Sequence, residues 1–162
     1  MFDKEIEQDL RNYGEDIIGS PLFERAMGQT HHLRSSLGLH LLRVTRAGLF
    51  LSYALEKAGL KSDREKIVIG GLCHDLGMVG RHEKYRNNRE CSAKHPLDSV
   101  KAAEELCPGI DEETKRIIEC HMYPLNRKAP DSVEGVIILL ADKYASVKDL
   151  VAGRGKSRNR TA

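Results

Sequence analysis

Apolar residues recur at helical spacing through most of the chain. From about Ser36 to Ala58 they return every three or four positions, which predicts one long helix that ends at Gly59. Ser20 followed by Pro21 predicts the start of an earlier helix, because a proline at the first helical position loses no hydrogen bond. The runs "KIVIGGL" and "GVIILL", which are ambiguous between strand and helix in isolation, lie inside longer helical patterns. The pattern therefore predicts an all-α fold.

Capping signals divide the middle of the chain into shorter elements. Residues 62–65, "SDRE", are typical of a capping box, which predicts a helix that opens there and stops near Gly77. Residues 78–94 are polar and charged and predict a long loop. Pro96 then predicts the first turn of a helix that continues through about Leu106.

Two further helices are predicted before the C-terminus. Asp111 is a candidate cap for a helix that reaches about His121, and "MYPLNRKAP" predicts a second loop. Asp131, with Glu134 three residues later, predicts the opening of the last helix, over residues 132–151.

Composition narrows the class of protein. A chain of 162 residues with 40% hydrophobic and 31% charged residues is typical of one soluble domain. Its longest apolar runs, such as "VIILLA", are too short to span a bilayer, and no basic-then-apolar leader is present. Four cysteines without CxxC spacing are predicted to stay reduced. We therefore expect a cytoplasmic protein that does not act in a membrane.

The positive charge is concentrated at the C-terminal end. The net charge is +2, but without the four basic residues of the last ten the chain carries 22 basic against 24 acidic residues. Such a tail is typical of a disordered terminus rather than of a nucleic-acid arm, so nucleic acid is not expected as the main partner. The predicted organisation is a helical segment over 1–29, a domain over 30–152 and a basic, disordered tail over 153–162.

Several predicted helices place a titratable side chain on an apolar face. A single such histidine is more often a hydrogen-bonded core residue than a metal ligand, but a buried aspartate needs a partner. Lys143 is predicted to point about 100° away from its neighbour Asp142, which makes it a poor partner. A metal site shared by all of these groups is the simpler explanation. The group comprises His40, His74, Asp75, His121 and Asp142.

The order histidine, then His-Asp, then aspartate resembles the signature of the HD-domain superfamily of metal-dependent phosphohydrolases. The resemblance covers about residues 30–150 and is carried by "LHLLRVT", "IGGLCHDLGM" and "VIILLADKYAS". In addition, "AKHP" and "IIECHMYPL" resemble the two extra histidine motifs of members that hold a second metal. The resemblance implies a compact helical bundle whose metal ligands project into its centre.

The resemblance also implies a ligand set. His32, in "QTHHL", matches a further upstream histidine of small bacterial members, and it is a candidate substrate-binding residue. His74 and Asp75 are the implied catalytic pair. One ion would be held by His40, His74, Asp75 and Asp142, and a second by His95 and His121 with Asp75 bridging.

The donor types indicate which metals and which chemistry to expect. Mixed imidazole and carboxylate ligands favour Fe, Mn, Zn, Ni or Co over Mg. One or two such divalent ions would activate a water for attack on a phosphate ester, so the expected partner is a small phosphorylated substrate. Basic neighbours are candidate phosphate contacts, although each is also explained as solvated surface. They are Arg43, Lys94, Lys143 and Arg81.

Two departures from the family pattern limit the choice of substrate. Many relatives with two metals have a lysine where this chain has Met78. No Gly-Tyr-Pro signature is present, and Met122 rather than histidine follows His121, which disfavours a cyclic-di-GMP phosphodiesterase. The leading hypothesis is a phosphohydrolase acting on a phosphomonoester, a nucleotide or a dinucleoside polyphosphate. The alternatives are a di-iron oxygenase of the same family and a metal-stabilised, non-catalytic binding module; the oligomeric state is open.

Overall fold

The chain folds as a bundle of helices, which confirms the predicted all-α class. The computed structural model describes residues 1–32 and 35–155, except for the side chains of residues 31, 32 and 150–155. Two short strands, β1 and β2, pair antiparallel. The elements are α1 (Asp3–Ile18), α2 (Pro21–Gly28), β1 (Thr30–His32), β2 (Ser35–Ser36), α3 (Leu37–Lys57), α4 (Arg64–Cys73), the 3-10 helix η1 (Leu76–Met78), α5 (Arg81–Lys84), α6 (Asn88–Leu106), α7 (Glu112–Cys120) and α8 (Val133–Gly155).

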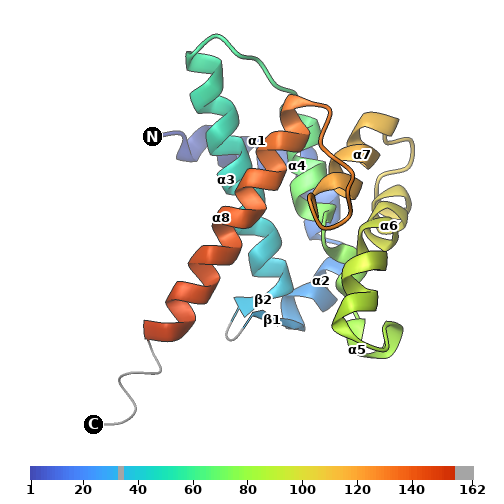
Figure 1. Cartoon of the computed structure of the whole chain (residues 1–162). Coiled ribbons are helices and arrows are strands. Elements are labelled where there is room, and N and C mark those ends of the chain that lie inside the picture. Colours follow the sequence, from blue (N-terminus) through green and yellow to red (C-terminus); the bar gives the residue numbers. More distant parts are fainter. Residues whose placement is uncertain (33–34, 156–162) are drawn as a thin grey trace.

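Helix α4 lies at the centre of the bundle. Figure 1 shows α8 crossing α3 on one side of α4, with α6 and α7 on the other side. Every residue of α4 from Ile67 to Cys73 is buried. A Cβ at Gly71 would lie 2.6 Å from Thr45 Oγ1 of α3, so the absence of a side chain there lets the two helices approach. The chain that follows α4 is thereby held in the middle of the molecule.

Four predicted helix boundaries are confirmed. Gly59, which follows the end of α3, has φ of 88°, a left-handed conformation that suits glycine. Three N-terminal caps accept a hydrogen bond from the main-chain N–H three residues later, as expected. These caps are Ser20 for α2 (3.2 Å), Ser36 for α3 (3.2 Å) and Asp111 for α7 (2.8 Å).

Two predicted caps are wrong by one residue. Asp63, rather than Ser62, caps α4 by accepting a hydrogen bond from Lys66 N at 3.3 Å. Likewise Ser132, rather than Asp131, caps α8. The carboxylate of Glu134 does not close a box on its own helix; it accepts a hydrogen bond from Asp63 N at 2.7 Å and so ties the start of α8 to that of α4.

The predicted loop over 78–94 is largely helical. Helix α5 lies within it, and α6 begins at Asn88 rather than at Pro96, which lies inside the helix. The reason is local: Asn87 accepts a hydrogen bond from Glu90 N at 2.9 Å, and Glu90 pairs with Lys94 one turn later. These contacts extend α6 by two turns ahead of the proline.

The N-terminal helix packs on the same core. Phe2, Ile6, Leu10 and Ile17 join the cluster of buried apolar side chains that also contains Leu72 of α4. Among the described helices, none is long and apolar enough to cross a membrane. The division of the chain into 1–29, 30–152 and 153–162 stays a prediction, and residues 156–162 of the predicted tail lie outside the described residues.

Candidate metal centre

The six predicted ligands meet at the centre of the bundle, although they come from five helices or their ends. All six are buried, and they form two groups of possible metal ligands in which the donor atoms lie within 4.8 Å of one another. We call these groups half-sites. The first half-site is His40, His74 and Asp142, and the second half-site is Asp75, His95 and His121.

Helices α3 and α8 bring the first half-site together. Asp142 Oδ1 lies 3.2 Å from His40 Nε2 and 3.9 Å from His74 Nε2. His40 is in the first turn of α3 and Asp142 is near the middle of α8, where the two helices cross. His74, the residue at the C-terminal end of α4, reaches the same point from the centre of the bundle.

Asp75 anchors the second half-site and also faces the first. Its Oδ1 lies 3.1 Å from His95 Nε2 of α6 and 3.2 Å from His121 Nε2 at the end of α7. Its Oδ2 lies 3.6 Å from His74 Nε2. The two oxygens of one carboxylate therefore face ligands of both half-sites.

Three of the four histidines are oriented by main-chain carbonyls. A carbonyl oxygen only accepts hydrogen bonds, so the Nδ1 that faces it carries the hydrogen, and the Nε2 lone pair points inward. This orientation of imidazole is typical of metal ligands. The pairs are His74 Nδ1 with Gly71 O (2.9 Å), His95 Nδ1 with Cys91 O (2.8 Å) and His121 Nδ1 with Ile118 O (2.6 Å).

The inward-facing lone pairs need a cation. His95 Nε2 and His121 Nε2 lie 3.1 Å apart, and in the tautomers set by the carbonyls both atoms are acceptors. His74 Nε2 is buried without a hydrogen-bond partner among the described residues, which is costly in a protein interior. A divalent transition metal bound by imidazole and carboxylate would satisfy these atoms, so the residues present fit such an ion.

The pKa of His74 supports the same ligand state, whereas for His40 and His95 burial opposes protonation but Asp142 and Asp75 outweigh it and raise the pKa. Burial lowers the pKa of His74 to about 4, so this imidazole is neutral at physiological pH. Burial opposes ionisation of Asp75 and Asp142, but the histidines around them outweigh it and hold the pKa of both carboxyls well below the usual range. Neutral imidazoles and ionised carboxylates are the forms that bind metal.

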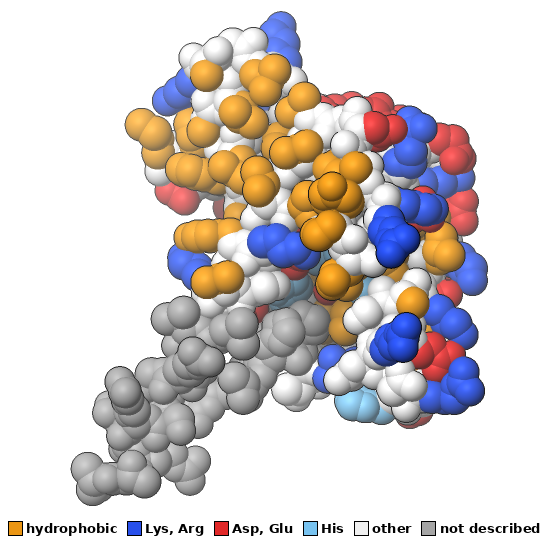
Figure 2. All heavy atoms as spheres, viewed as in Figure 1, with side chains coloured by type: hydrophobic (Ala, Val, Ile, Leu, Met, Phe, Trp, Pro, Cys, Tyr) orange, Lys and Arg blue, Asp and Glu red, His pale blue; other side chains and the backbone are white. Residues whose placement is uncertain are grey.

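Solvent reaches the centre from the side of its carboxylates. Asp75 and Asp142 are each 6% exposed, whereas His40, His74 and His121 are fully buried. In Figure 2, histidine side chains are visible at the base of a recess that is bordered by basic and hydrophobic side chains. A small solute would therefore approach the carboxylates first.

The lysine next to Asp142 lies at the same opening, contrary to expectation. Lys143 was predicted to point away from Asp142, and this is wrong: its Nζ lies 2.9 Å from Asp142 Oδ2 and 3.4 Å from His121 O. The flexible stem of lysine lets the ammonium fold back although its Cα faces another direction. Its side chain is 47% exposed, so the ammonium also meets solvent.

One buried acid beside the centre was missed at the level of sequence. Asp149 lies on α8, and its Oδ2 is 3.4 Å from His40 Nδ1. Its other oxygen pairs with Arg43, which also donates to Ser35 Oγ at 3.0 Å. Asp149 follows Asp142 by seven residues, two helical turns, and this spacing was the available signal.

The described contacts of two other candidate substrate-binding residues, Lys94 and Arg81, are with residues other than the six candidate ligands. Lys94 is exposed and pairs with Glu90 at 2.7 Å. Arg81 belongs to α5, where its Nε lies 3.4 Å from His82 Nε2. The main chain of His32 forms part of β1, but its side chain lies outside the described residues. Their proposed contacts with substrate stay predictions.

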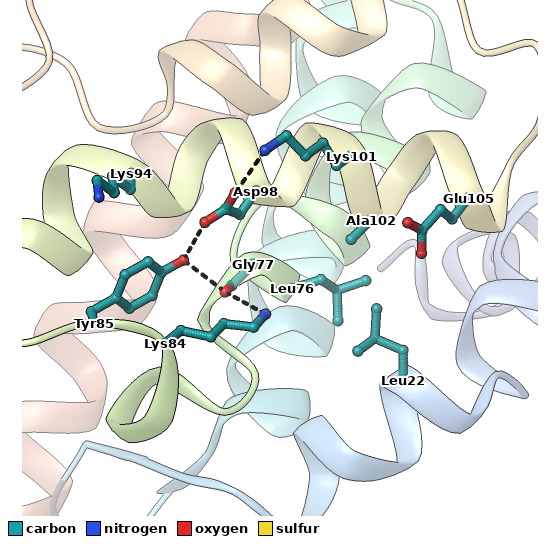
Figure 3. A pocket seen from close by; sticks show the side chains of 10 residues that line it. All are labelled: Leu22, Leu76, Gly77, Lys84, Tyr85, Lys94, Asp98, Lys101, Ala102 and Glu105. Carbon is teal, nitrogen blue, oxygen red and sulfur yellow. Dashed lines mark hydrogen bonds and ion pairs between the residues drawn. The ribbon is translucent and has the colours of Figure 1, made fainter.

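A separate pocket adjoins the turn that follows the His-Asp pair. Its volume is about 560 Å³, and Lys94 belongs to its lining, which includes none of the six candidate ligands. Figure 3 shows Tyr85 pointing to the Gly77 carbonyl and to Asp98; the Tyr85 hydroxyl oxygen lies 3.0 Å from the first and 2.7 Å from the second. These contacts fix η1, and thus Asp75 just before it, against α6.

Comparison with protein families gives one match over most of the chain. The family model described as the HD domain matches residues 37–146, a range that contains all six candidate ligands. Comparison with curated proteins and with solved structures finds no match.

Proposed function

The chain belongs to the HD-domain family, whose members are of the metal-dependent phosphohydrolase type, and from this premise we propose that it hydrolyses a small phosphate ester. The proposed substrate is a nucleotide or another phosphomonoester, or a dinucleoside polyphosphate. The reaction would take place at a centre that holds two divalent transition metal ions. The observation that carries the proposal is the position of Asp75, whose two oxygens face ligands of both half-sites.

Each half-site supplies the ligands of one proposed ion. His40, His74 and Asp142 would hold the first ion together with Asp75, and His95 and His121 would hold the second with the same Asp75. When bound, two such ions supply a water of lowered pKa and positive charge for the phosphoryl oxygens. The fixed tautomers keep the Nε2 of His74, His95 and His121 ready to bind without rearrangement.

The carboxylates of Asp75 and Asp142 have a second proposed role besides binding metal. Asp75 and Asp142 are the most exposed of the six ligands, so they face the side from which substrate would enter. Because both carboxyls are ionised, each can accept a hydrogen bond or a proton from a water at the opening. We assign to Asp75 the role of bridging the two ions. We assign to His74 the role of orienting Asp75 toward the first half-site.

Lys143 is the proposed phosphate contact. Its ammonium lies between Asp142 of the first half-site and the carbonyl of His121 in the second, and it is half-exposed at the opening. An ammonium donates charge-assisted hydrogen bonds to phosphate oxygens. Many relatives place a lysine directly after Gly77; here that position is Met78, and α8 provides the lysine instead.

Metal content and turnover measured on one sample test the proposal. Protein purified without chelators is analysed for transition metals and then assayed for phosphate release from a panel of nucleotides and dinucleoside polyphosphates. About two equivalents of metal with phosphate release would support the proposal. Metal-loaded protein that consumes O₂ in a redox-dependent manner would instead identify an oxygenase. Metal without any turnover would identify a binding module.

A further inference from the structure

His40 is oriented differently from the other three histidines of the centre. The described Nδ1 contacts of His74, His95 and His121 are with carbonyls three or four residues earlier in the chain. The Nδ1 of His40 instead faces the carboxylate of Asp149, which is 109 residues away in the chain. One imidazole of the proposed centre therefore depends on a charged side chain for its orientation.

The position of His40 in its helix explains the difference. His74 and His121 are the C-terminal caps of α4 and α7, where the last carbonyls of a helix have no helical partner and are available as acceptors. His40 lies in the first turn of α3, where the unpaired main-chain groups are N–H donors. An acceptor for its Nδ1–H must therefore come from another element, and α8 provides Asp149.

Asp149 is in turn held by Arg43. The arginine lies three residues after His40 on α3 and pairs with Asp149 Oδ1, while its guanidinium also donates to Ser35 Oγ of β2 at 3.0 Å. Asp149 is only 8% exposed and shares α8 with the buried Asp142. A buried carboxylate needs a counter-charge, and the guanidinium supplies it.

We propose that Asp149 is a positioning residue, which holds His40 in the Nδ1–H tautomer with its Nε2 toward the first half-site, and that Arg43 acts through Asp149. This inference rests on the metal centre proposed above. A carboxylate that accepts the Nδ1–H of a metal-bound imidazole fixes the ring and strengthens it as a donor. Asp149 itself does not touch substrate or metal in this assignment.

Cobalt affinity gives the first test. Metal-free protein is titrated with Co²⁺, whose visible absorption reports binding to the centre. Asp149→Asn keeps the shape and removes the charge, and we expect Co²⁺ to bind ~10- to 100-fold more weakly. Arg43→Gln should weaken binding less, because Asp149 remains. The control is Arg46→Gln, on the same helix, where Arg46 pairs with Glu7 at 2.9 Å; we expect an unchanged affinity.

The double variant separates a relay from two independent effects. If Arg43 acts through Asp149, then Arg43→Gln combined with Asp149→Asn should bind Co²⁺ as weakly as Asp149→Asn alone. Additive losses would overturn the assignment of Arg43. An affinity of Asp149→Asn equal to that of the unmodified protein would overturn the assignment of Asp149.

A spectroscopic measurement distinguishes failure of this inference from failure of the proposed function. Nitrogen NMR of metal-free protein reports whether the Nδ1 of His40 carries a hydrogen, while its Nε2 faces Asp142 at 3.2 Å. We expect the Nδ1–H form in the unmodified protein and in Arg46→Gln, and its loss in Asp149→Asn. Retention of that form in Asp149→Asn would contradict the positioning role. Failure of unmodified protein to bind Co²⁺ would contradict the proposed centre, while the tautomer would still decide the role of Asp149.

Discussion

The two half-sites differ in how one imidazole is held: His74 of the first half-site is oriented by a main-chain carbonyl, as are both histidines of the second, whereas the described Nδ1 contact of His40 is with Asp149. In the first half-site, the ring nitrogens of His40 face two charged side chains of α8: Asp142 at Nε2 and Asp149 at Nδ1. In the second half-site, His95 and His121 are held by main-chain carbonyls of their own chain segments. The first half-site therefore depends on the packing of two long helices and on charge. The second depends on the helices α6 and α7 being formed, and on η1 holding Asp75 against them.

The largest expected effect is at the residue common to both half-sites. Asp75→Ala removes the carboxylate that faces His74 on one side and His95 and His121 on the other. We expect loss of both metal ions and a fall in phosphate release on the order of 10³-fold. Elemental analysis and the phosphate assay measure this, with Asp16→Ala on the exposed side of α1 as the control. Full metal content in Asp75→Ala would contradict the ligand assignment.

Removing a ligand of only one half-site should separate the two. His121→Ala should lose the ion of the second half-site and retain that of the first, with phosphate release reduced on the order of 10²-fold. Its counterpart, His40→Ala, should reduce the affinity of the first half-site. Metal titration of both variants measures this. If His121→Ala lost all metal, the half-sites would not be separable.

A smaller effect is expected where η1 contacts α6. A Cβ at Gly77 would lie 2.5 Å from both His95 O and Ser99 N, and main-chain atoms cannot rotate away. Gly77→Ala should therefore reduce the free energy of unfolding by about 1–3 kcal/mol and weaken metal binding at the second half-site more than at the first. Urea unfolding measures the change in stability. The control is Gly28→Ala, where an added Cβ meets nothing within 4 Å.

The smallest expected effect concerns the hydroxyl that fixes η1. Tyr85→Phe removes the contacts with Gly77 O and Asp98, and we expect a loss of about 1 kcal/mol in the free energy of unfolding. The first half-site should lose less affinity than the second, because Asp75 is only one of its four proposed ligands. Urea unfolding and metal titration test both expectations, and Tyr13→Phe at an exposed position serves as the control. An equal loss of affinity at both half-sites would show that η1 does not act mainly on the second.

The fold class and the meeting of the six side chains were within reach of the sequence. Helical spacing and local caps, such as those at Ser20, Ser36 and Asp111, depend on neighbouring residues and can be read along the chain. The predicted loop over 78–94 shows that a high average polarity does not by itself indicate a loop, because this stretch is largely helical. The cap at Asn87 and the pair of Glu90 with Lys94 outweigh the polar character of that stretch.

What the sequence did not indicate depends on contacts between distant segments. The spacing of Asp149 from Asp142 places both on one face of α8, but Asp149 acquires its role only because α8 crosses α3 beside His40, and the spacing does not record that crossing. Lys143 was misplaced because the direction of its Cα was taken as the direction of its ammonium. A long, flexible side chain reaches back to Asp142 whatever the direction of its Cα.

The most direct test of the central claim, that both half-sites form one centre around Asp75, is the electron paramagnetic resonance spectrum of protein loaded with Mn²⁺. Two ions bridged by a shared carboxylate are magnetically coupled, so the account predicts the spectrum of an exchange-coupled pair at about two equivalents per chain. The hyperfine spectrum of isolated Mn²⁺ at every loading, or saturation at a single equivalent, would contradict it.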